Sequence, residues 1–232
     1  MTPTEIAPKL LTLARSPIGK KLMTGITGLG LTSFVVLHCV GNLLMFASGD
    51  RYNAYGRFIE DLGPLLGLFE LGLLAVVVVH AGYGLHLFLG RLRSRPIGYA
   101  QYASRGEPSL QSLSSRTMIV TGSIVAGFLI THLLTFKFGP YYSTMVGDRP
   151  GRDLARLVIE TFHKPAYTLG YTAVMVMLGL HLRHGIWSAL QSIGLMSRPV
   201  RAGLYGFSAV LAIAIAIGFL VLPISIYFGW VR

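Results

Sequence analysis

Residues 204–230 read LYGFSAVLAIAIAIGFLVLPISIYFGW and contain no Asp, Glu, Lys or Arg. A hydrocarbon layer of about 30 Å needs roughly 20 apolar residues in a helix that rises about 1.5 Å per residue. Helices in the core of soluble proteins rarely run that far without a charge. The stretch therefore predicts a helix that crosses a membrane.

Four more apolar stretches of similar length precede this one, and the charged residues collect between them. The sequence thus predicts an all-α membrane protein with five transmembrane helices, at about residues 23–46, 65–89, 117–138, 165–190 and 204–230. The connections are short, so we expect residues 1–232 to form a single domain. Apolar residues at helical spacing predict short amphipathic helices at residues 5–16 and 152–162.

Lysine and arginine are unevenly distributed over the connections. The chain has a net charge of +11, and almost all of the excess falls on the segments that share a side with the amino terminus. Because cytoplasmic segments are enriched in Lys and Arg, we expect the amino terminus inside and the carboxy terminus outside. The excess of positive charge is densest at residues 15–21 and 91–116. It either reflects topology alone or forms a docking surface for a soluble subunit. We expect no nucleic-acid partner.

Histidine is unusually frequent inside the predicted spans. An ionisable side chain in the hydrocarbon is costly, and where one occurs it commonly faces the bundle interior and marks a functional site. Any one of them could be a core imidazole bonded to a hydroxyl or carbonyl group. Six together favour a site: His38, His80, His86, His132, His181 and His184.

The depths of these histidines form two pairs. His38 and His132 each lie about 15 residues from the inner end of their spans, or roughly 22 Å along the helix. His80 and His181 lie about as far from the outer ends of theirs, and so share a level nearer the inside. Two pairs at two heights, each pair on two helices, suit two haems with bis-imidazole ligation. Within its span His184 is the alternative to His181; a glycine four residues later, as after His80, favours His181.

Other residues of the spans bear on the same interpretation. Gly41, Gly84 and Gly185 lie about one turn from a candidate ligand, where small residues leave room either for a porphyrin or for a neighbouring helix. His86 lies about 240° around its helix from the ligand face and is expected to be interfacial or hydrogen-bonding. Cys39 is the single cysteine, so no Cys-x-x-Cys-His motif exists for covalent haem attachment.

Several segments together carry a family resemblance that runs from about residue 16 to residue 230. The chain resembles the five-helix, di-haem cytochrome b membrane anchor of succinate:menaquinone oxidoreductases and fumarate reductases. Each segment alone is weakly specific, whereas their order and spacing are specific. They are SPIGKK (16–21), TGLGLTSFVVLHCVGNLL (27–44), RYNAYGRFIEDLGPLL (51–66), HAGYG (80–84), ITHLLTFKFG (130–139) and HLRHGIWSALQSIG (181–194).

The resemblance implies two non-covalent b haems and a role in electron transfer. By position, His38 and His132 would ligate the outer haem, and His80 and His181 the inner one, with His184 as the alternative in the fourth span. An iron–sulfur subunit, itself fed by a flavoprotein subunit that oxidises succinate, would pass electrons through the haems to a quinone such as menaquinone. The chain would then be the membrane anchor and electron-transfer subunit of a succinate dehydrogenase in the bacterial cytoplasmic (inner) membrane.

A quinone site needs a group that handles protons near a haem and near lipid. Related anchors carry an acid before the second span, so we expect Glu60 to have this role, with Asp61 as the second candidate. A solvated ion pair with Arg57 is the competing interpretation. A site near the inner haem would instead use Tyr83 and Arg91.

Two other functions fit part of the pattern. A cytochrome b subunit of a hydrogenase or formate dehydrogenase would need the same histidine geometry and is disfavoured only by the flanking segments. A transporter or proton channel would need interrupted helices and paired acids at mid-membrane. Glu70 is the one acid near the interior of a predicted span.

Overall fold

The computed structural model describes residue 12 and residues 16–94 and 113–231. Within these residues five helices are long and apolar enough to cross a membrane, which confirms the predicted spans to within a few residues at each end. They are α2 (Pro17–Leu43, continued by the 3₁₀ turn η1, Leu44–Phe46), α4 (Pro64–Ser94), α6 (Met118–His132, continued by the π-helical turn η2, Leu133–Lys137), α8 (Pro165–Ser192) and α9 (Arg201–Tyr227).

Prolines mark the beginnings of several of these helices. Pro17, Pro64 and Pro165 are the first residues of α2, α4 and α8. A proline at this position loses nothing, since the first amide of a helix has no partner within the helix. The Ser16 side chain caps α2 by accepting a hydrogen bond of 3.0 Å from the Gly19 amide.

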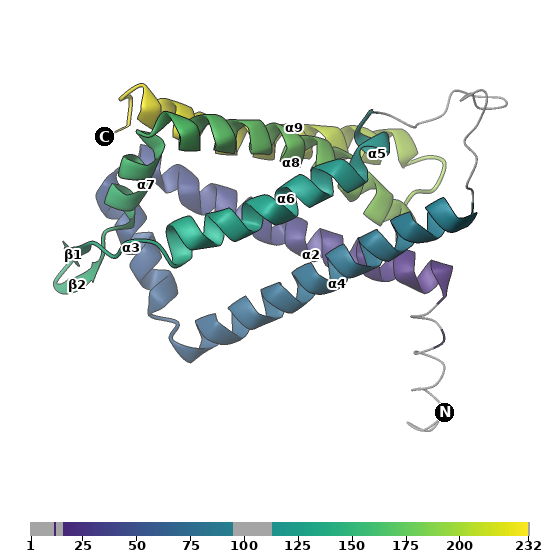
Figure 1. Cartoon of the computed structure of the whole chain (residues 1–232), viewed down its shortest axis with the longest axis horizontal. Helices are drawn as coiled ribbons and strands as arrows, with labels where there is room; N and C mark the ends of the chain where they lie inside the picture. The colour runs from purple at the N-terminus through teal and green to yellow at the C-terminus, as the bar shows by residue number, and fades with distance from the viewer. Residues whose placement is uncertain (1–11, 13–15, 95–112, 232) are drawn as a thin grey trace.

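Successive membrane-spanning helices run in opposite directions, and the beginning of α2 and the end of α9 lie at opposite ends of the bundle (Figure 1). Helices α8 and α9 pack along each other, α2 lies against α4, α8 and α9, and α6 packs on α8. Helix α4 packs chiefly on α2 and buries none of its residues. Its large apolar side chains are exposed, as expected for a surface that meets lipid.

Four short elements gather at the end of the bundle where α9 terminates, whereas the short helix α5 (Leu113–Arg116) lies near the opposite end (Figure 1). We call this group the cap: helix α3 (Gly49–Glu60), the antiparallel strands β1 (Ser143–Val146) and β2 (Arg149–Arg152), and helix α7 (Leu154–Phe162). The helix predicted at 152–162 is confirmed for 154–162, with Asp153 as its N-cap. Helix α3 and the hairpin were not expected from the sequence.

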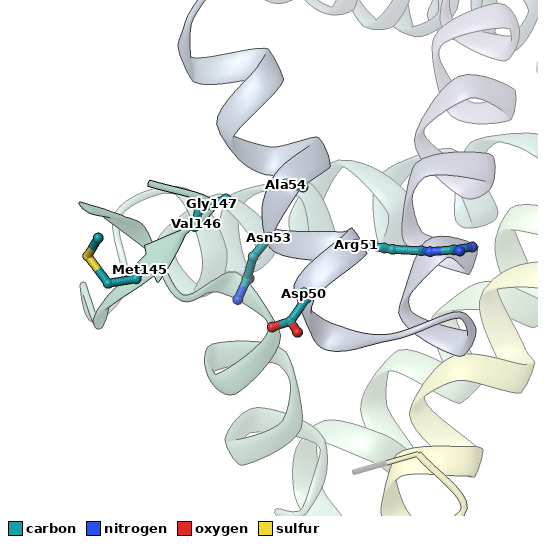
Figure 2. Close-up of a pocket in the computed structure, with 7 residues that line it drawn as sticks. All are labelled: Asp50, Arg51, Asn53, Ala54, Met145, Val146 and Gly147. Carbon is teal, nitrogen blue, oxygen red and sulfur yellow. The ribbon is translucent and has the colours of Figure 1, made fainter. Parts of the chain in front are cut away.

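Asn53 ties the cap together. Its side-chain amide donates to Asp153 Oδ1, and its carbonyl oxygen accepts from the Ala155 amide, both at 2.9 Å. Asn53 is only 7% exposed, so both halves of a buried amide are satisfied. Beside it, α3 and the hairpin border a half-open hollow of about 390 Å³ (Figure 2), lined by Asp50, Arg51, Asn53, Ala54, Met145, Val146 and Gly147.

Two predicted features lie largely outside the described residues. These are the amphipathic helix at residues 5–16 and most of the basic segment 91–116. The predicted docking surface is therefore represented only by residues 16–21, 91–94 and 113–116, all at the end of the bundle opposite the cap.

Candidate functional site

The structure brings four of the six intramembrane histidines together in two facing pairs. The ring centroids of His38 and His132 are 5.7 Å apart with an interplanar angle of 89°. Those of His80 and His181 are 6.3 Å apart with an angle of 73°. We call them the outer pair, near the cap, and the inner pair, near the opposite end. The pairing and the two levels are those expected from residue depth.

The spacing of the rings suits one metal ion between each pair. Imidazole nitrogens bind transition metals at about 2 Å, so two rings that face each other across one ion have centroids about 6 Å apart. Each pair would supply two axial ligands, and a porphyrin would supply the remaining nitrogens of a six-coordinate iron. The donor set of both pairs therefore fits a haem.

His80 of α4 is held by the first turns of α2. Its Nδ1 lies 3.1 Å from the Thr24 carbonyl oxygen and 3.4 Å from Thr27 Oγ1. A carbonyl oxygen can only accept, so His80 Nδ1 carries the proton and its Nε2 keeps a lone pair. The ring also lies directly over Gly28, where an added Cβ would come within 3.0 Å of it.

His181 of α8 is held in the same way by α6. Its Nδ1 lies 3.2 Å from Thr121 Oγ1. The Thr121 hydroxyl also lies 3.1 Å from the carbonyl oxygen of Thr117. With its one proton in that bond, it accepts from a His181 ring that carries its proton on Nδ1. An added Cβ at Gly122 would lie 3.1 Å from the His181 ring. Both rings of the inner pair thus keep an unprotonated Nε2, the usual state of a metal-binding histidine.

The outer pair lies among aromatic rings instead. Phe34 stacks on His38 at 5.5 Å. The other rings within 6.2 Å of either histidine are Phe128, Phe136, Tyr171 and Phe219. His132 Nδ1 is buried and has no hydrogen-bond partner among the described residues. Nδ1 of His184 is in the same condition, so this feature alone does not distinguish a ligand.

The other two intramembrane histidines lie elsewhere. His184 contacts the Trp187 ring at 5.3 Å, whereas His181 faces His80. His86 is exposed, and its Nε2 lies 2.7 Å from Lys20 Nζ, in line with the expected hydrogen-bonding role.

The glycines near the candidate ligands fall into two groups. An added Cβ at Gly84 or Gly185 would meet no atom within 4 Å, so open space lies beside these two glycines, each four residues after a histidine of the inner pair. At Gly41 the Tyr55 ring of α3 already fills that position, at 2.6 Å from the added Cβ. Gly41 therefore serves the contact between α2 and α3, the helix-packing alternative of the prediction.

Helix α3 is fastened to α2 one turn beyond His38. The Tyr52 hydroxyl donates to Asn42 Oδ1 at 3.1 Å, and the Asn42 amide donates to the His38 carbonyl oxygen at 2.8 Å. Burial, and to a smaller extent the neighbouring Tyr55, raise the pKa of Tyr52 to about 12. The hydroxyl thus remains a donor at any physiological pH, and the cap is coupled to the helix that carries His38.

The four residues expected to handle protons differ in position and exposure. Glu60 is exposed at the last position of α3, and Asp61 pairs with Arg57 at 2.9 Å. On the inner side, Tyr83 is half-buried in α4 and Arg91 is exposed near its end.

A feature that sequence reasoning missed is an ion pair between Glu70 of α4 and Lys137 of η2. Glu70 precedes His80 by ten residues, or about 15 Å along α4, which places it near the level of the outer pair. The preceding Phe69 contacts Phe34, which stacks on His38. The sequence signal that could have indicated this ion pair is an acid and a base near the outer ends of consecutive spans.

Among the described residues no group of three or more His, Cys, Asp and Glu side chains could hold a metal ion. Comparison with protein-family models, with curated proteins and with solved structures found no match to this chain.

Proposed function

We propose that this chain is a di-haem cytochrome b that carries electrons along the axis of its transmembrane bundle. The observation that carries the proposal is the facing of His38 with His132 and of His80 with His181 at two levels. The hydrogen bonds at Nδ1 of the inner pair support it, because they leave both Nε2 atoms free for iron. Bound haem would supply one-electron redox chemistry, and the chain would supply axial ligands and an apolar surrounding.

The proposal extends to a membrane anchor of a succinate:menaquinone oxidoreductase. The sequence segments that resemble this family support it, and so does the basic end of the bundle beside the inner pair, where an iron–sulfur subunit with its flavoprotein partner would dock. Electrons would pass from that subunit to the inner haem, then to the outer haem and to quinone in the bacterial inner membrane. A cytochrome b subunit of a hydrogenase or formate dehydrogenase would use the same histidine pairs and is the second candidate.

Quinone reduction consumes two electrons and two protons, so the quinone site needs a proton donor near one haem. We retain Glu60 as a candidate for this proton donor, with Asp61 as the second choice, and add Glu70 as a further candidate. Glu70 lies on a span near the level of the outer pair, while Glu60 lies on the exposed side of the cap.

The experiment that tests the proposed function is a haem determination on the purified chain. We expect a pyridine haemochrome assay to give two b haems per chain and a reduced-minus-oxidised spectrum of low-spin, six-coordinate iron. One haem per chain would reject half of the proposal, and a protein that cannot bind haem would reject it entirely. Copurification with flavin and iron–sulfur subunits would favour the succinate:menaquinone anchor over the hydrogenase or formate dehydrogenase alternative.

A further inference from the structure

The two helices that hold the inner pair in place are the same two that carry the outer pair. In α2, Thr27 and Gly28 contact the ring of His80. In α6, Thr121 and Gly122 contact the ring of His181. Each contact therefore joins a ligand helix to a neighbour that carries no ligand of that pair.

The sequence repeats this arrangement with one spacing. His38 follows Thr27 by eleven residues, and His132 follows Thr121 by eleven residues. Eleven residues are about three helical turns, so the threonine and the histidine lie on nearly the same face, about 16 Å apart along the axis. Helices α2 and α6 thus each present a Thr-Gly pair to the inner level and a histidine to the outer level.

Each threonine hydroxyl also lies within hydrogen-bonding distance of carbonyl oxygens in its own helix. Thr121 is 1% exposed, and its hydroxyl lies 3.1 Å from the Thr117 carbonyl oxygen and 3.2 Å from that of Met118. Thr27 is 8% exposed and lies 2.6 Å from the Met23 carbonyl oxygen. A hydroxyl group whose proton is committed to its own helix offers only lone pairs to a neighbour. In this arrangement each threonine accepts a hydrogen bond from an imidazole that carries its proton on Nδ1.

We propose that Thr121 and Thr27 are positioning residues for the inner haem: they hold the Nδ1 protons of His181 and His80 so that each Nε2 is presented to the iron. This inference rests on the proposed haem function. Gly28 and Gly122 contribute to the same positioning of the imidazole rings, because a side chain at either position would displace the ring from its acceptor.

His80 and His181 differ in the acceptors that surround their Nδ1 atoms, and this difference makes the proposal testable. His80 Nδ1 retains the Thr24 carbonyl oxygen at 3.1 Å when the Thr27 hydroxyl is removed. For His181, Thr121 Oγ1 supplies the acceptor, at 3.2 Å. Loss of the Thr121 hydroxyl should therefore disturb the inner haem more than loss of the Thr27 hydroxyl.

The experiment compares Thr121→Val, Thr121→Ser and Thr27→Val with the wild-type chain. Thr131→Val is the matched control, because Thr131 is an exposed threonine of α6 that bonds only to its own helix, at the Phe128 carbonyl oxygen. Haem transfer to excess apomyoglobin, the low-spin electron paramagnetic resonance signals and the midpoint potential are measured for each haem. The inner signals are assigned from a His80→Ala variant.

We expect Thr121→Val to weaken retention of the inner haem about tenfold and to shift its resonance and potential, the effect typical of lost hydrogen bonds to metal ligands. Thr121→Ser should restore wild-type behaviour, Thr27→Val should show a smaller change, and Thr131→Val none. The outer haem of the same molecule reports whether a variant has folded. A Thr121→Val protein with two haems and unchanged inner signals would overturn the inference but leave the proposed function intact. Equal loss of both haems would also contradict selective positioning, whereas a wild-type chain that binds no haem would reject the function itself.

Discussion

The outer and inner histidine pairs have the same composition but different surroundings. The inner rings are held through hydrogen bonds to Thr24 and Thr121 and lie over glycines. The outer rings are held by aromatic side chains, with His132 Nδ1 unbonded among the described residues. Hydrogen bonds select a tautomer and a ring direction, whereas aromatic contacts restrict position alone.

The difference follows from which helices meet at each level. Helices α4 and α8 bring histidines to the inner level and aromatic residues to the outer one, where Phe69 contacts Phe34 and Tyr171 contacts His132. The outer level also adjoins the cap, through Tyr52 and Tyr55 of α3. The outer haem should therefore depend on the cap, and the inner haem on the contacts between spans.

The largest effect is expected from removal of a ligand. His38→Ala or His132→Ala should eliminate the outer haem and leave the inner one, while His80→Ala or His181→Ala should do the reverse, since one remaining imidazole cannot maintain six-coordinate low-spin iron. Haem content per chain and the low-spin resonance signals measure the outcome.

His184→Ala is the matched control for His181→Ala, because it removes a neighbouring histidine that contacts Trp187 rather than His80. If His184→Ala loses the inner haem while His181→Ala keeps it, the assignment within α8 is wrong.

The next largest effect concerns the quinone site. Quinone reductase activity of the variants shows whether that site adjoins the outer or the inner histidine pair. If the site adjoins the outer pair, Glu70→Gln or Glu60→Gln should reduce quinone reductase activity at least tenfold by removing the proton donor, with both haem spectra unchanged. Asp148→Asn is the control, because Asp148 is an exposed acid of the hairpin. Full activity in both glutamine variants would move the site to the inner level.

A smaller effect should follow from loosening the cap. Asn53→Ala leaves the buried Ala155 amide without its acceptor, which costs about 1–3 kcal/mol. Upon heating, the outer haem should be released at a lower temperature than in the wild type, while release of the inner haem is unchanged. The exposed Ser143→Ala of the same cap serves as the control. Equal shifts for both haems would show that the cap does not act on one level selectively.

The smallest effect is a pH dependence of the cap. Hydrogen bonds from Tyr142 and from Arg156 lower the pKa of Glu160. The stabilising effect is therefore present above the pKa of Glu160 in the unfolded chain and is lost as pH falls through the lower pKa of the folded state. Release of the outer haem should become easier over that acidic range in the wild type and less so in Glu160→Gln, as measured by absorbance between pH 6 and about 3.

The cap and the histidine pairs differ in how far the sequence could predict them. Helix α3 is polar and short, so its residues resembled a loop leading into α4, and the hairpin around Gly147 (φ 65°) has strands of only four residues. The bond between Asn53 and Asp153 spans a hundred positions, and no local pattern indicates it. The ion pair between Glu70 and Lys137 was equally hidden from local patterns, since the two residues lie on different helices.

The sequence alone determined the number of spans, their ends to within six residues, and the pairing of histidines by depth. This was possible because a chain in lipid must satisfy its backbone hydrogen bonds internally, so that position along a span converts directly into depth at about 1.5 Å per residue. Only the tertiary structure decided how each helix is rotated and which neighbour it meets: that His181 rather than His184 faces His80, and that Thr-Gly pairs support the inner rings. Lipid exerts no preference among apolar faces, so rotation depends on close packing of small residues and on a few polar contacts between helices, which no single helix encodes.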